Sequence, residues 1–266
     1  MNHRAAAELL PFVRREVDGR GVVTLTLDRP QSFNALSEGM LASLQDELDA
    51  IALDEGVRAV VIAATGKAFS AGHDLKEMRS APSLAYYETL FAQCARVMLT
   101  IQRLPVPVIA RVQGIATAAG CQLVAACDLA VAVDSARFAV SGVNLGLFCS
   151  SPSVPLSRNL GRKAAFEMLV TGEFISAEEA RAKGLVNRVV AADALDRELE
   201  SLLAAIVAKP RVAVALGKRL FYRQLENGIE AAYEDAGQTM ACNMMEPEAL
   251  EGVQAFIDKR KPAWAK

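Results

Sequence analysis

The chain has 266 residues, of which 52% are hydrophobic and 23% are charged, and 29 Lys and Arg against 31 Asp and Glu leave a formal net charge of −2 at pH 7. This composition is typical of a soluble globular protein with a large core, and the charge balance argues against partners such as nucleic acid or an anionic membrane. No apolar run reaches the ~18 residues of a membrane helix, because Gln122 and Asp128 interrupt the best candidate.

The few cysteines and histidines limit disulfide and metal chemistry. The five cysteines are odd in number and follow no paired spacing, which favours buried free thiols over disulfides. His3 and His73 are the two histidines of the sequence, so a zinc site has little to build from and we expect no metal. The first residues contain Glu8 and lack a sustained apolar core, which argues against a secretory signal. We therefore expect a cytoplasmic protein.

Strand and helix patterns alternate over the first two thirds of the chain. Apolar residues repeat on one face after Ser37, a predicted N-cap, and again over Leu84–Leu104, which indicates two amphipathic helices. Apolar runs typical of buried strands follow one another along the chain at Val22–Leu27, 57–65, Val106–Val112 and Leu129–Val133. This order predicts an α/β protein with a mainly parallel sheet.

The last third of the chain is predicted to be almost entirely helical. Helical patterns cover 162–171 and the segment after Ser176, where Ser176 and Glu179 form a capping box and Gly184 ends the helix. One short strand at 185–190 follows, and beyond Ala191 the sequence shows helices alone. We divide the chain into an α/β core, residues 1–195, and a helical C-terminal region, residues 196–266.

Two turns share one design. In AFSAGHDLKEM (68–78) and in GIATAAGCQLVAAC (114–127), a buried strand passes through small residues into a helix. The first amides of a helix have no internal partner and the dipole there is positive, so two such turns converging could hold an anion or oxyanion. On composition alone, close packing of helix on sheet is the simpler interpretation. Neither turn matches a dinucleotide or Walker-type phosphate loop, and no G-x-S-x-G motif is present.

Five segments resemble the crotonase superfamily, the enoyl-CoA hydratase/isomerase family, in order and spacing: LDRPQSFNAL, KAFSAGHDLKEM, GIATAAGCQLVAACDLAVA, TGEFISAEEARAKGLVNRVV and FIDKRKPAW. The resemblance covers Val17 to Trp264. GVNLGLFCSSP and FIDKRKPAW are also similar to the subgroup called enoyl-CoA hydratase domain-containing protein 3. The resemblance implies a spiral of repeated strand-strand-helix turns with a helical C-terminal extension, and an acyl-CoA thioester as substrate.

The resemblance also implies an oxyanion hole for the thioester carbonyl. In the family pattern AG-x-D the amide of x is one donor, and that position is His73. The second donor is the amide of the second glycine in GGGCE, a position that Ala119 occupies here. Donors fixed before reaction contribute about 10²–10³ in rate each.

Both glutamates by which the family's hydratases add water are replaced. The first falls on Gln122, and the second, in F-x-x-P-E-x-x-x-G, falls on Gly142. Gln122 can orient a water molecule but cannot accept a proton near neutral pH, and Gly142 has no side chain. Each positioned acid–base group is worth about 10²–10⁴-fold, so we expect hydration to be weak.

The family places the CoA nucleotide over the loop after the first strand. By resemblance, CoA, as part of the substrate and not as a resident cofactor, is bound by Gln31, Ser32, Phe33, Asp74, Leu75, Lys76, Lys218 and Phe221. Lys76 could meet a phosphate as a point charge, while Lys218 and Phe221 could close over the adenine from a neighbouring subunit. Plain solvation is the alternative for these basic residues. Relatives form trimers or pairs of trimers, and the apolar C-terminal helices favour the same assembly here.

Three rival interpretations remain open. An oxyanion hole without a base still favours decarboxylation of a malonyl-type thioester, because that reaction makes an enolate without removing a proton. A non-catalytic acyl-CoA binding protein is the rival from another class, and an RNA-binding role is disfavoured by the net charge.

Cys149 lies in the polar segment FCSSP, which we interpret as a structural loop, with a nucleophilic thiol as the alternative. Asp128 is expected to cap a helix end or to bond locally.

Overall fold

A computed structural model describes residues 11–80 and 82–265. The first ten residues, which bear on the expectation of no secretory signal and begin the expected core, lie outside this range. The strands are β1 Val13–Val17, β2 Val22–Leu27, β3 Ala59–Ala64, β4 Ala68–Ser70, β5 Val108–Val112, β6 Ile115–Thr117, β7 Leu129–Val133, β8 Arg137–Ala139, β9 Ile175–Ser176 and β10 Arg188–Val190.

Helices connect the strands and make up the C-terminal part of the chain. The α-helices are α1 Glu38–Ala52, α2 Leu75–Ser80, α3 Leu84–Arg103, α4 Ala119–Ala126, α5 Ser150–Asn159, α6 Arg162–Thr171, α7 Ala177–Lys183, α8 Leu195–Val207, α9 Arg211–Gln224, α10 Ile229–Met244 and α11 Pro247–Ile257. Short 3₁₀ helices lie at Pro30–Ser32 (η1), Ser141–Leu145 (η2) and Ala192–Ala194 (η3).

The strands form two sheets, and the chain adds strands to both as it advances. The first has the order β1-β2-β3-β5-β7-β10, and the second has the order β4-β6-β8-β9. Neighbouring strands run parallel except in the pairs β1–β2 and β8–β9. From β3 to β8 the chain repeats one unit three times: a strand of the first sheet, a strand of the second sheet, and then one or two α-helices. This is the expected spiral of strand-strand-helix turns.

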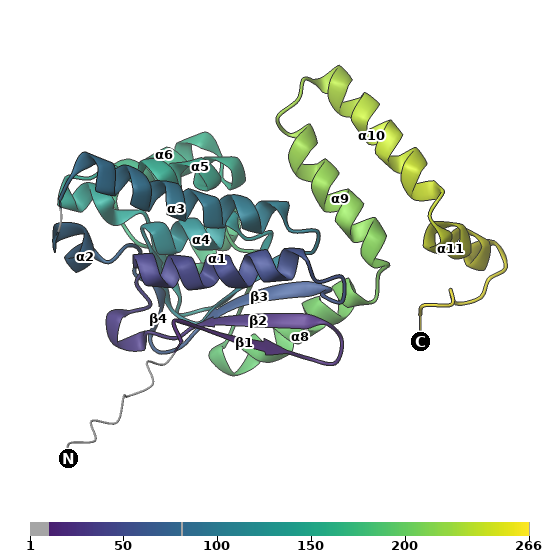
Figure 1. Cartoon of the computed structure of the whole chain (residues 1–266), viewed down its shortest axis with the longest axis horizontal. Coiled ribbons are helices and arrows are strands. Elements are labelled where there is room, and N and C mark those ends of the chain that lie inside the picture. The colour runs from purple at the N-terminus through teal and green to yellow at the C-terminus, as the bar shows by residue number, and fades with distance from the viewer. Residues whose placement is uncertain (1–10, 81, 266) are drawn as a thin grey trace, which may run out of the picture.

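Helices cover both faces of the larger sheet, which explains why its central strands are apolar throughout. All six residues of β3 are buried. Helices α1 and α3 lie over one face and α8 over the other (Figure 1). Helix α1 begins where Ser37 accepts a hydrogen bond from the Met40 amide, and its buried stripe includes Leu41, Leu44 and Leu48.

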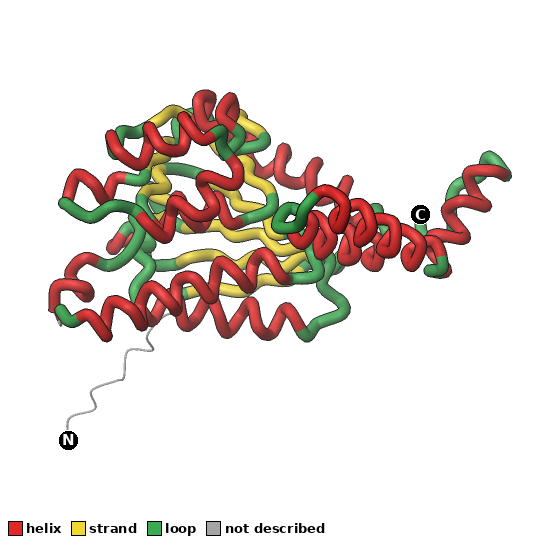
Figure 2. The backbone as a smooth tube through the Cα atoms, turned by 90° about the horizontal axis from the view of Figure 1, so that it is seen from above, coloured by secondary structure: helices red, strands yellow, loops and turns green. Residues whose placement is uncertain are grey.

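The last three helices leave the core. Helix α8 packs on the sheet through Leu195, Leu199 and Leu203, which are buried. Helices α9, α10 and α11 then extend away from the core as an arm, which Figures 1 and 2 show from two directions. The division at residue 195 stays a prediction, and within the expected C-terminal region it is the segment beyond α8 that projects.

The expected elements are present with their caps. The capping box of Ser176 and Glu179 starts α7, and Gly184 ends it with a left-handed conformation at φ 93°. The short strands β4, β6, β8 and β9 of the second sheet were not expected, because two or three residues carry no periodic signal. The segment around Ser150 was expected to be a loop and is the first turn of α5.

Candidate active site

A cavity of about 630 Å³ opens beside the second sheet. Its walls come from the loop after β2, the turn between β4 and α2, the start of α4, and the segment from Ser141 to Pro152. Most of the predicted site residues line it, namely Gln31–Phe33, His73–Lys76, Ala119 and Gly142. Residues that are distant in sequence are thus brought together as expected.

The turn between β4 and α2 presents a main-chain amide to the cavity. Gly72 has φ 88°, and its carbonyl accepts a hydrogen bond from the Leu36 amide at 2.7 Å. Asp74 Oδ1 then caps α2 by accepting hydrogen bonds from the amides of Lys76 (2.9 Å) and Glu77 (3.2 Å). His73 lies between Gly72 and Asp74, whose hydrogen bonds fix the turn. No described residue accepts the hydrogen of the His73 main-chain N–H.

The second turn presents the first amide of α4. Helix α4 begins at Ala119, and the Gln122 amide donates to the Ala118 carbonyl at 3.0 Å. The Ala119 N–H has no acceptor within α4, as for any first residue of a helix, nor elsewhere in the described chain. Ala118 itself has φ 49° and ψ −123°, a conformation that alanine rarely adopts. The strain shows that the surrounding structure forces this turn.

The two turns meet. A Cβ atom built on Gly72 would lie 2.9 Å from Ala118 Cβ and 3.0 Å from Ala119 N. A Cβ built on Gly120 would lie 2.2 Å from the Ser70 carbonyl oxygen, so α4 starts in direct contact with the end of β4. The glycines therefore permit the close approach that brings the unpaired amides of His73 and Ala119 to one edge of the cavity.

Asn34 shapes the loop that is expected to hold the CoA nucleotide, and sequence reasoning missed it. The residue is fully buried with φ 51°. Its Oδ1 accepts the Arg29 amide at 2.9 Å, and its Nδ2 donates to the carbonyls of Thr65 (2.8 Å) and Ala68 (2.9 Å). These bonds tie the loop to the β3–β4 connection and leave Phe33, which is 56% exposed, at the cavity. An Asn in a turn after Arg-Pro is the signal that could have found it.

At Gly142 the structure leaves no space for a side chain. A Cβ atom there would lie 2.5 Å from the Leu147 carbonyl oxygen and 2.8 Å from Cys149 Sγ. The loop that closes over Gly142 turns back at Gly146, which has φ 78°, and the Leu147 amide donates to the Gly142 carbonyl at 3.0 Å. The family's second carboxylate is therefore excluded by this backbone as well as absent from the sequence.

Burial sets the protonation state of two side chains that line the cavity, His73 and Cys149. Burial lowers the pKa of His73 and outweighs the hydrogen bond between Nδ1 and the Leu36 carbonyl at 3.2 Å, so the imidazole is neutral at pH 7. Its ring meets Phe91 edge-on with the centroids 5.5 Å apart. Burial also raises the pKa of the Cys149 thiol, which therefore keeps its proton at neutral pH.

Gln122 does not line the cavity, although it follows Ala119 by less than one helical turn. Its side chain is buried, with Oε1 4.0 Å from Cys94 Sγ on α3. The expected role of orienting a water molecule for the substrate finds no support in this position. The helix turns Gln122 toward α3 because residues three apart in a helix differ in direction by about 60°.

Lys218 does not line the cavity, and its position gives no support to the expected contact with CoA. Its ammonium is buried against the core and donates to the carbonyls of Ile101 and Val106, both at 2.9 Å, and to Asp128 Oδ2 at 2.6 Å. All three donors are used, so none remains for a phosphate. Phe221, on the same helix, is 56% exposed and lies outside the cavity lining.

Asp128 joins three elements instead of capping one helix locally. Besides Lys218, it accepts the Val108 amide at 2.6 Å and the Tyr222 hydroxyl at 2.6 Å. Burial is the first cause that raises the pKa of Tyr222, and the nearby Asp128 carboxylate adds to it. Asp128 therefore fixes α9 to the sheet. No local pattern indicates the contact of Asp128 with α9, because Lys218 and Tyr222 lie 90 and 94 residues further on.

The described residues contain neither a metal-binding cluster nor a membrane-spanning helix. Among residues 11–80 and 82–265, no group of three or more His, Cys, Asp or Glu side chains is placed to hold a metal ion. Within the same residues no helix has the length and apolar character needed to cross a bilayer. All five cysteines are free, and Cys242 is the exposed one.

The interleaved sheets and the Ala/Gly-lined cavity define the class of this protein. The sequence model of the enoyl-CoA hydratase/isomerase family matches residues 18–266, so the chain belongs to that family. Solved structures with this fold confirm the α/β spiral and its helical C-terminal region. Membership also confirms, at the level of the family, the expectation of a lyase-class enzyme.

Individual relatives are similar over most of the chain. The mitochondrial enoyl-CoA hydratase domain-containing protein 3 of Rattus norvegicus is 46% identical over 92% of this chain and 82% of its own length. The crystal structure of the human protein of that name has a TM-score of 0.92 and 44% identity, covering 95% of this chain and all of the other. An enoyl-CoA hydratase structure from Mycobacterium smegmatis has a TM-score of 0.95 and 70% identity, covering 96% and 100%. The expected subgroup resemblance is confirmed.

The expectation of a cytoplasmic protein is contradicted by these relatives. The rat, mouse and human members of the subgroup are named mitochondrial. The expectation depended on the lack of a secretory signal and of a membrane-length apolar run. Neither feature reports on import into an organelle, so the inference was not justified.

Proposed function

We propose that this protein binds acyl-CoA thioesters and stabilises their enolates through the main-chain N–H groups of His73 and Ala119. The observation that carries the proposal is the contact between the two turns, where a Cβ on Gly72 would come within 3.0 Å of Ala119 N. Both amides lack acceptors among the described residues, and both residues line the cavity. Fixed donors of this kind need no reorganisation when charge develops on the thioester oxygen.

The rest of the cavity suits the two ends of such a substrate. Gln31, Ser32 and the exposed Phe33 ring offer a surface for the nucleotide, and the exposed Lys76 offers a charge to a phosphate. Met78, Phe91, Leu147 and Phe148 offer an apolar surface to the acyl group. CoA enters as part of the substrate in this proposal.

Hydration is proposed to be weak, although several relatives are named enoyl-CoA hydratases. Gln122 points to α3 and cannot act as a base, while Gly142 has no room for a carboxylate. Losing two positioned acid–base groups costs about 10⁴-fold or more in rate.

Calorimetry with acetoacetyl-CoA and a crotonyl-CoA hydration assay test this proposal together. We expect tight binding, with hydration about 10⁴-fold below that of a relative with both glutamates measured alongside. Ala119→Pro removes one amide hydrogen at a helix position where proline fits, and Ala119→Gly is the control that keeps it. Hydration at the relative's rate would show that the missing acids do not matter, and absence of binding would refute the proposal itself.

A second candidate, decarboxylation of a malonyl-type thioester, is favoured by the closed backbone at Gly142. Loss of CO₂ produces the enolate without a base, so the two amides are sufficient for that step. The expected result is CO₂ release from methylmalonyl-CoA or ethylmalonyl-CoA. Binding without any product from a panel of CoA esters would favour the non-catalytic acyl-CoA binding protein instead.

We further propose a trimer, or a pair of trimers, held together by the arm of α9, α10 and α11. In the isolated chain no residue of α9 is buried as a whole, although the Lys218 side chain is, while α10 buries Ala232 and α11 buries Ala255. Large apolar side chains along these helices are exposed, among them Tyr233, Met240 and Phe256. Such helices require a partner surface.

A further inference from the structure

The space beside Gly142 is filled by a thiol. A Cβ atom on Gly142 would lie 2.8 Å from Cys149 Sγ, so the sulfur stands where a side chain at position 142 would begin. Cys149 is the residue before α5, and the turn at Gly146 brings it back beside Gly142. The loop thus replaces the excluded side chain with one that belongs to a residue seven positions later.

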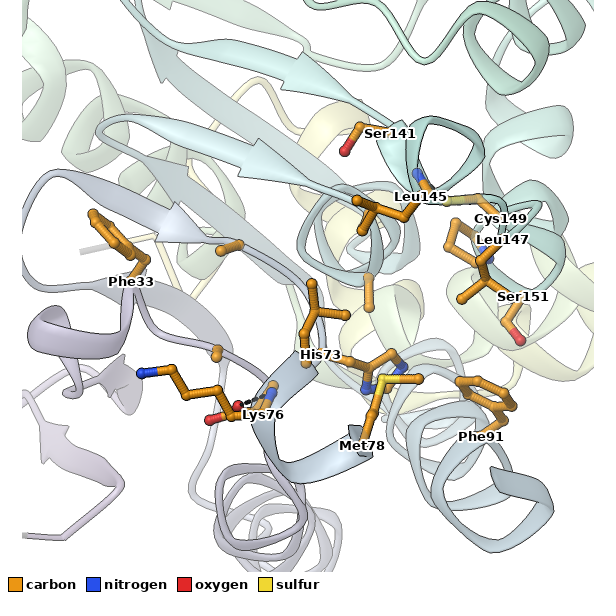
Figure 3. A pocket seen from close by; sticks show the side chains of 18 of the residues that line it. Phe33, His73, Lys76, Met78, Phe91, Ser141, Leu145, Leu147, Cys149 and Ser151 are labelled. Carbon is orange, nitrogen blue, oxygen red and sulfur yellow. Dashed lines mark hydrogen bonds between the residues drawn. The ribbon is translucent and has the colours of Figure 1, made fainter. Parts of the chain in front are cut away.

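The thiol hydrogen of Cys149 is available to the cavity. Sγ accepts the Gly142 N–H at 3.3 Å, which occupies a sulfur lone pair and leaves the S–H bond free. No described residue accepts that hydrogen, and Cys149 is 7% exposed. The residue lines the cavity on the side of Ser141, Leu145 and Leu147, while His73, Met78 and Phe91 lie on the other side (Figure 3). A buried thiol whose hydrogen has no acceptor among the described residues therefore borders the space in which an acyl group would lie.

We propose that Cys149 is the proton donor to Cα of the thioester enolate. The proposal rests on the proposed function in its decarboxylating form. After CO₂ leaves, the S–H bond breaks, a C–H bond forms at Cα and the thiolate takes a proton from water. No oxidant, reductant or further reactant is needed.

Whether Cys149 acts as a proton donor or as a nucleophile depends on whether its thiol is protonated. The thiolate is the nucleophilic form of cysteine, and burial keeps Cys149 as the thiol at neutral pH. A nucleophilic thiol needs a base in contact with it, and His73 lies on the other side of the cavity from Cys149, with its ring against Phe91 (Figure 3). The neighbouring hydroxyls are poorer donors, because an aliphatic hydroxyl is a far weaker acid than a thiol. Ser141 in addition shares its hydrogen bond with Thr117 at 2.9 Å.

Decarboxylation of methylmalonyl-CoA in D₂O tests the donor. A donor fixed on one side of the enolate delivers deuterium to one face, so the wild type yields propionyl-CoA of a single configuration at C2. Cys149→Ala is expected to give both configurations in nearly equal amounts, because water then protonates the enolate from either face. Ser151→Ala, which removes a hydroxyl from the same cavity wall, is expected to keep the single configuration.

Bromoacetyl-CoA tests the position of the thiol without turnover. Its electrophilic carbon is Cα, and the label is applied at alkaline pH, where hydroxide takes the thiol proton of Cys149, the thiolate forms an S–C bond and bromide leaves. Mass spectrometry is expected to find the label on Cys149, with protection by butyryl-CoA, and not on the buried Cys121 of α4, which does not line the cavity. Calorimetry with butyryl-CoA and thermal unfolding accompany each variant.

The outcomes separate this inference from the function on which it rests. A single configuration from folded Cys149→Ala protein, or no label on Cys149 despite ester binding, overturns the role of Cys149 alone. Binding without CO₂ release overturns both the donor role and decarboxylation while the thioester site stands. Absence of binding overturns the proposed function.

Discussion

Ala118 holds a backbone conformation that suits glycine better than alanine. Its φ of 49° and ψ of −123° place it outside the regions that L-residues prefer, at a cost of about 1–3 kcal/mol. The conformation aims the next amide, that of Ala119, at the cavity edge. Strain at this residue is therefore coupled to the arrangement of the proposed oxyanion hole.

We predict that Ala118→Gly stabilises the protein by about 1 kcal/mol. Relief of strain exceeds the ~0.5–1 kcal/mol that glycine loses through the larger freedom of the unfolded chain. Urea unfolding of both proteins measures the difference. The matched control is Ala119→Gly, which lies in the first turn of α4 with ordinary dihedrals and is expected to destabilise by about 0.5–1 kcal/mol. Equal effects at the two positions would show that Ala118 stores no strain.

At the scale of single residues, the sequence predicted main-chain positions better than side-chain roles. The resemblance of AGHD and of the Ala/Gly run to the family's motifs placed His73 and Ala119 at one cavity, and those motifs are short and local. The contacts of Lys218 with Asp128 and Ile101 were not predictable, since they depend on how α9 docks. The strain at Ala118 was equally out of reach, because it arises from contacts with the turn at Gly72.

At the scale of elements, one buried ion pair attaches α9 to the core. The side chains of Lys218 and Asp128 are 7% and 13% exposed, and Tyr222 from the next turn of α9 adds a third group. Burial lowers the pKa of Lys218 in spite of the carboxylate, which shows how much desolvation the ammonium suffers. The pair sets the direction in which the arm leaves the core.

We predict that Asp128→Ala costs about 3–5 kcal/mol in unfolding free energy, because it leaves the Lys218 ammonium buried without a counter-charge. The double variant Asp128→Ala/Lys218→Met is expected to lose less than the sum of the two single variants. Urea unfolding measures all three. Glu226→Gln, which breaks an exposed ion pair with Arg158, is the control and is expected to cost less than about 1 kcal/mol. Additive losses at 128 and 218 would argue against coupling.

A second element-scale contact fastens the chain end to α11. The Glu251 carboxylate accepts hydrogen bonds from Nη1 and Nη2 of Arg260, at 2.6 and 3.0 Å, and from the Ala263 amide at 2.8 Å. The Arg260 bond first, and the Ala263 amide second, lower the pKa of Glu251 from 4.5 to about 2. Trp264 lies over Gly252, where a Cβ atom would meet the ring at 2.8 Å.

We predict that this contact weakens as pH falls from 4.5 to about 2. A carboxylate whose pKa is lower in the folded chain stabilises that fold above its unfolded pKa and loses the effect as it is protonated. Fluorescence of Trp264, the one tryptophan of the sequence, reports the release. In Glu251→Gln the signal is expected to be that of the released end already at pH 7. A wild-type signal unchanged down to pH 2 would contradict the prediction.

Long elements with a strong period were predictable, and short ones were not. Helix α3 and strand β3 carry unbroken patterns and were placed within a few residues. Helix α5 was missed because Pro152 and Pro155 interrupt its sequence, although the first lies in the opening turn, where proline is tolerated. The short strands of the second sheet depend on pairing with neighbours far along the chain.

At the scale of the whole molecule, the arm is the part of the isolated chain whose large apolar side chains stay exposed to solvent. Phe256 is 86% exposed, Met245 is 75% exposed and Ile229 is 72% exposed, all on or beside the helices beyond α8. Pro210, Met240 and Trp264 line a further cavity of about 340 Å³ between these helices. Exposed apolar surface of this extent on a projecting segment marks an interface.

We predict that light scattering gives a mass three or six times the subunit mass of 28.4 kDa. Because association buries the apolar side chains of the arm, the double variant Met240→Lys/Phe256→Lys places two charges in the interface and shifts the mass toward one subunit. Leu53→Lys is the matched control, since Leu53 is 87% exposed at the end of α1, on the core. It is expected to leave the mass unchanged. A wild-type mass of one subunit at micromolar concentration would mean that the arm is covered by something other than further copies of this chain.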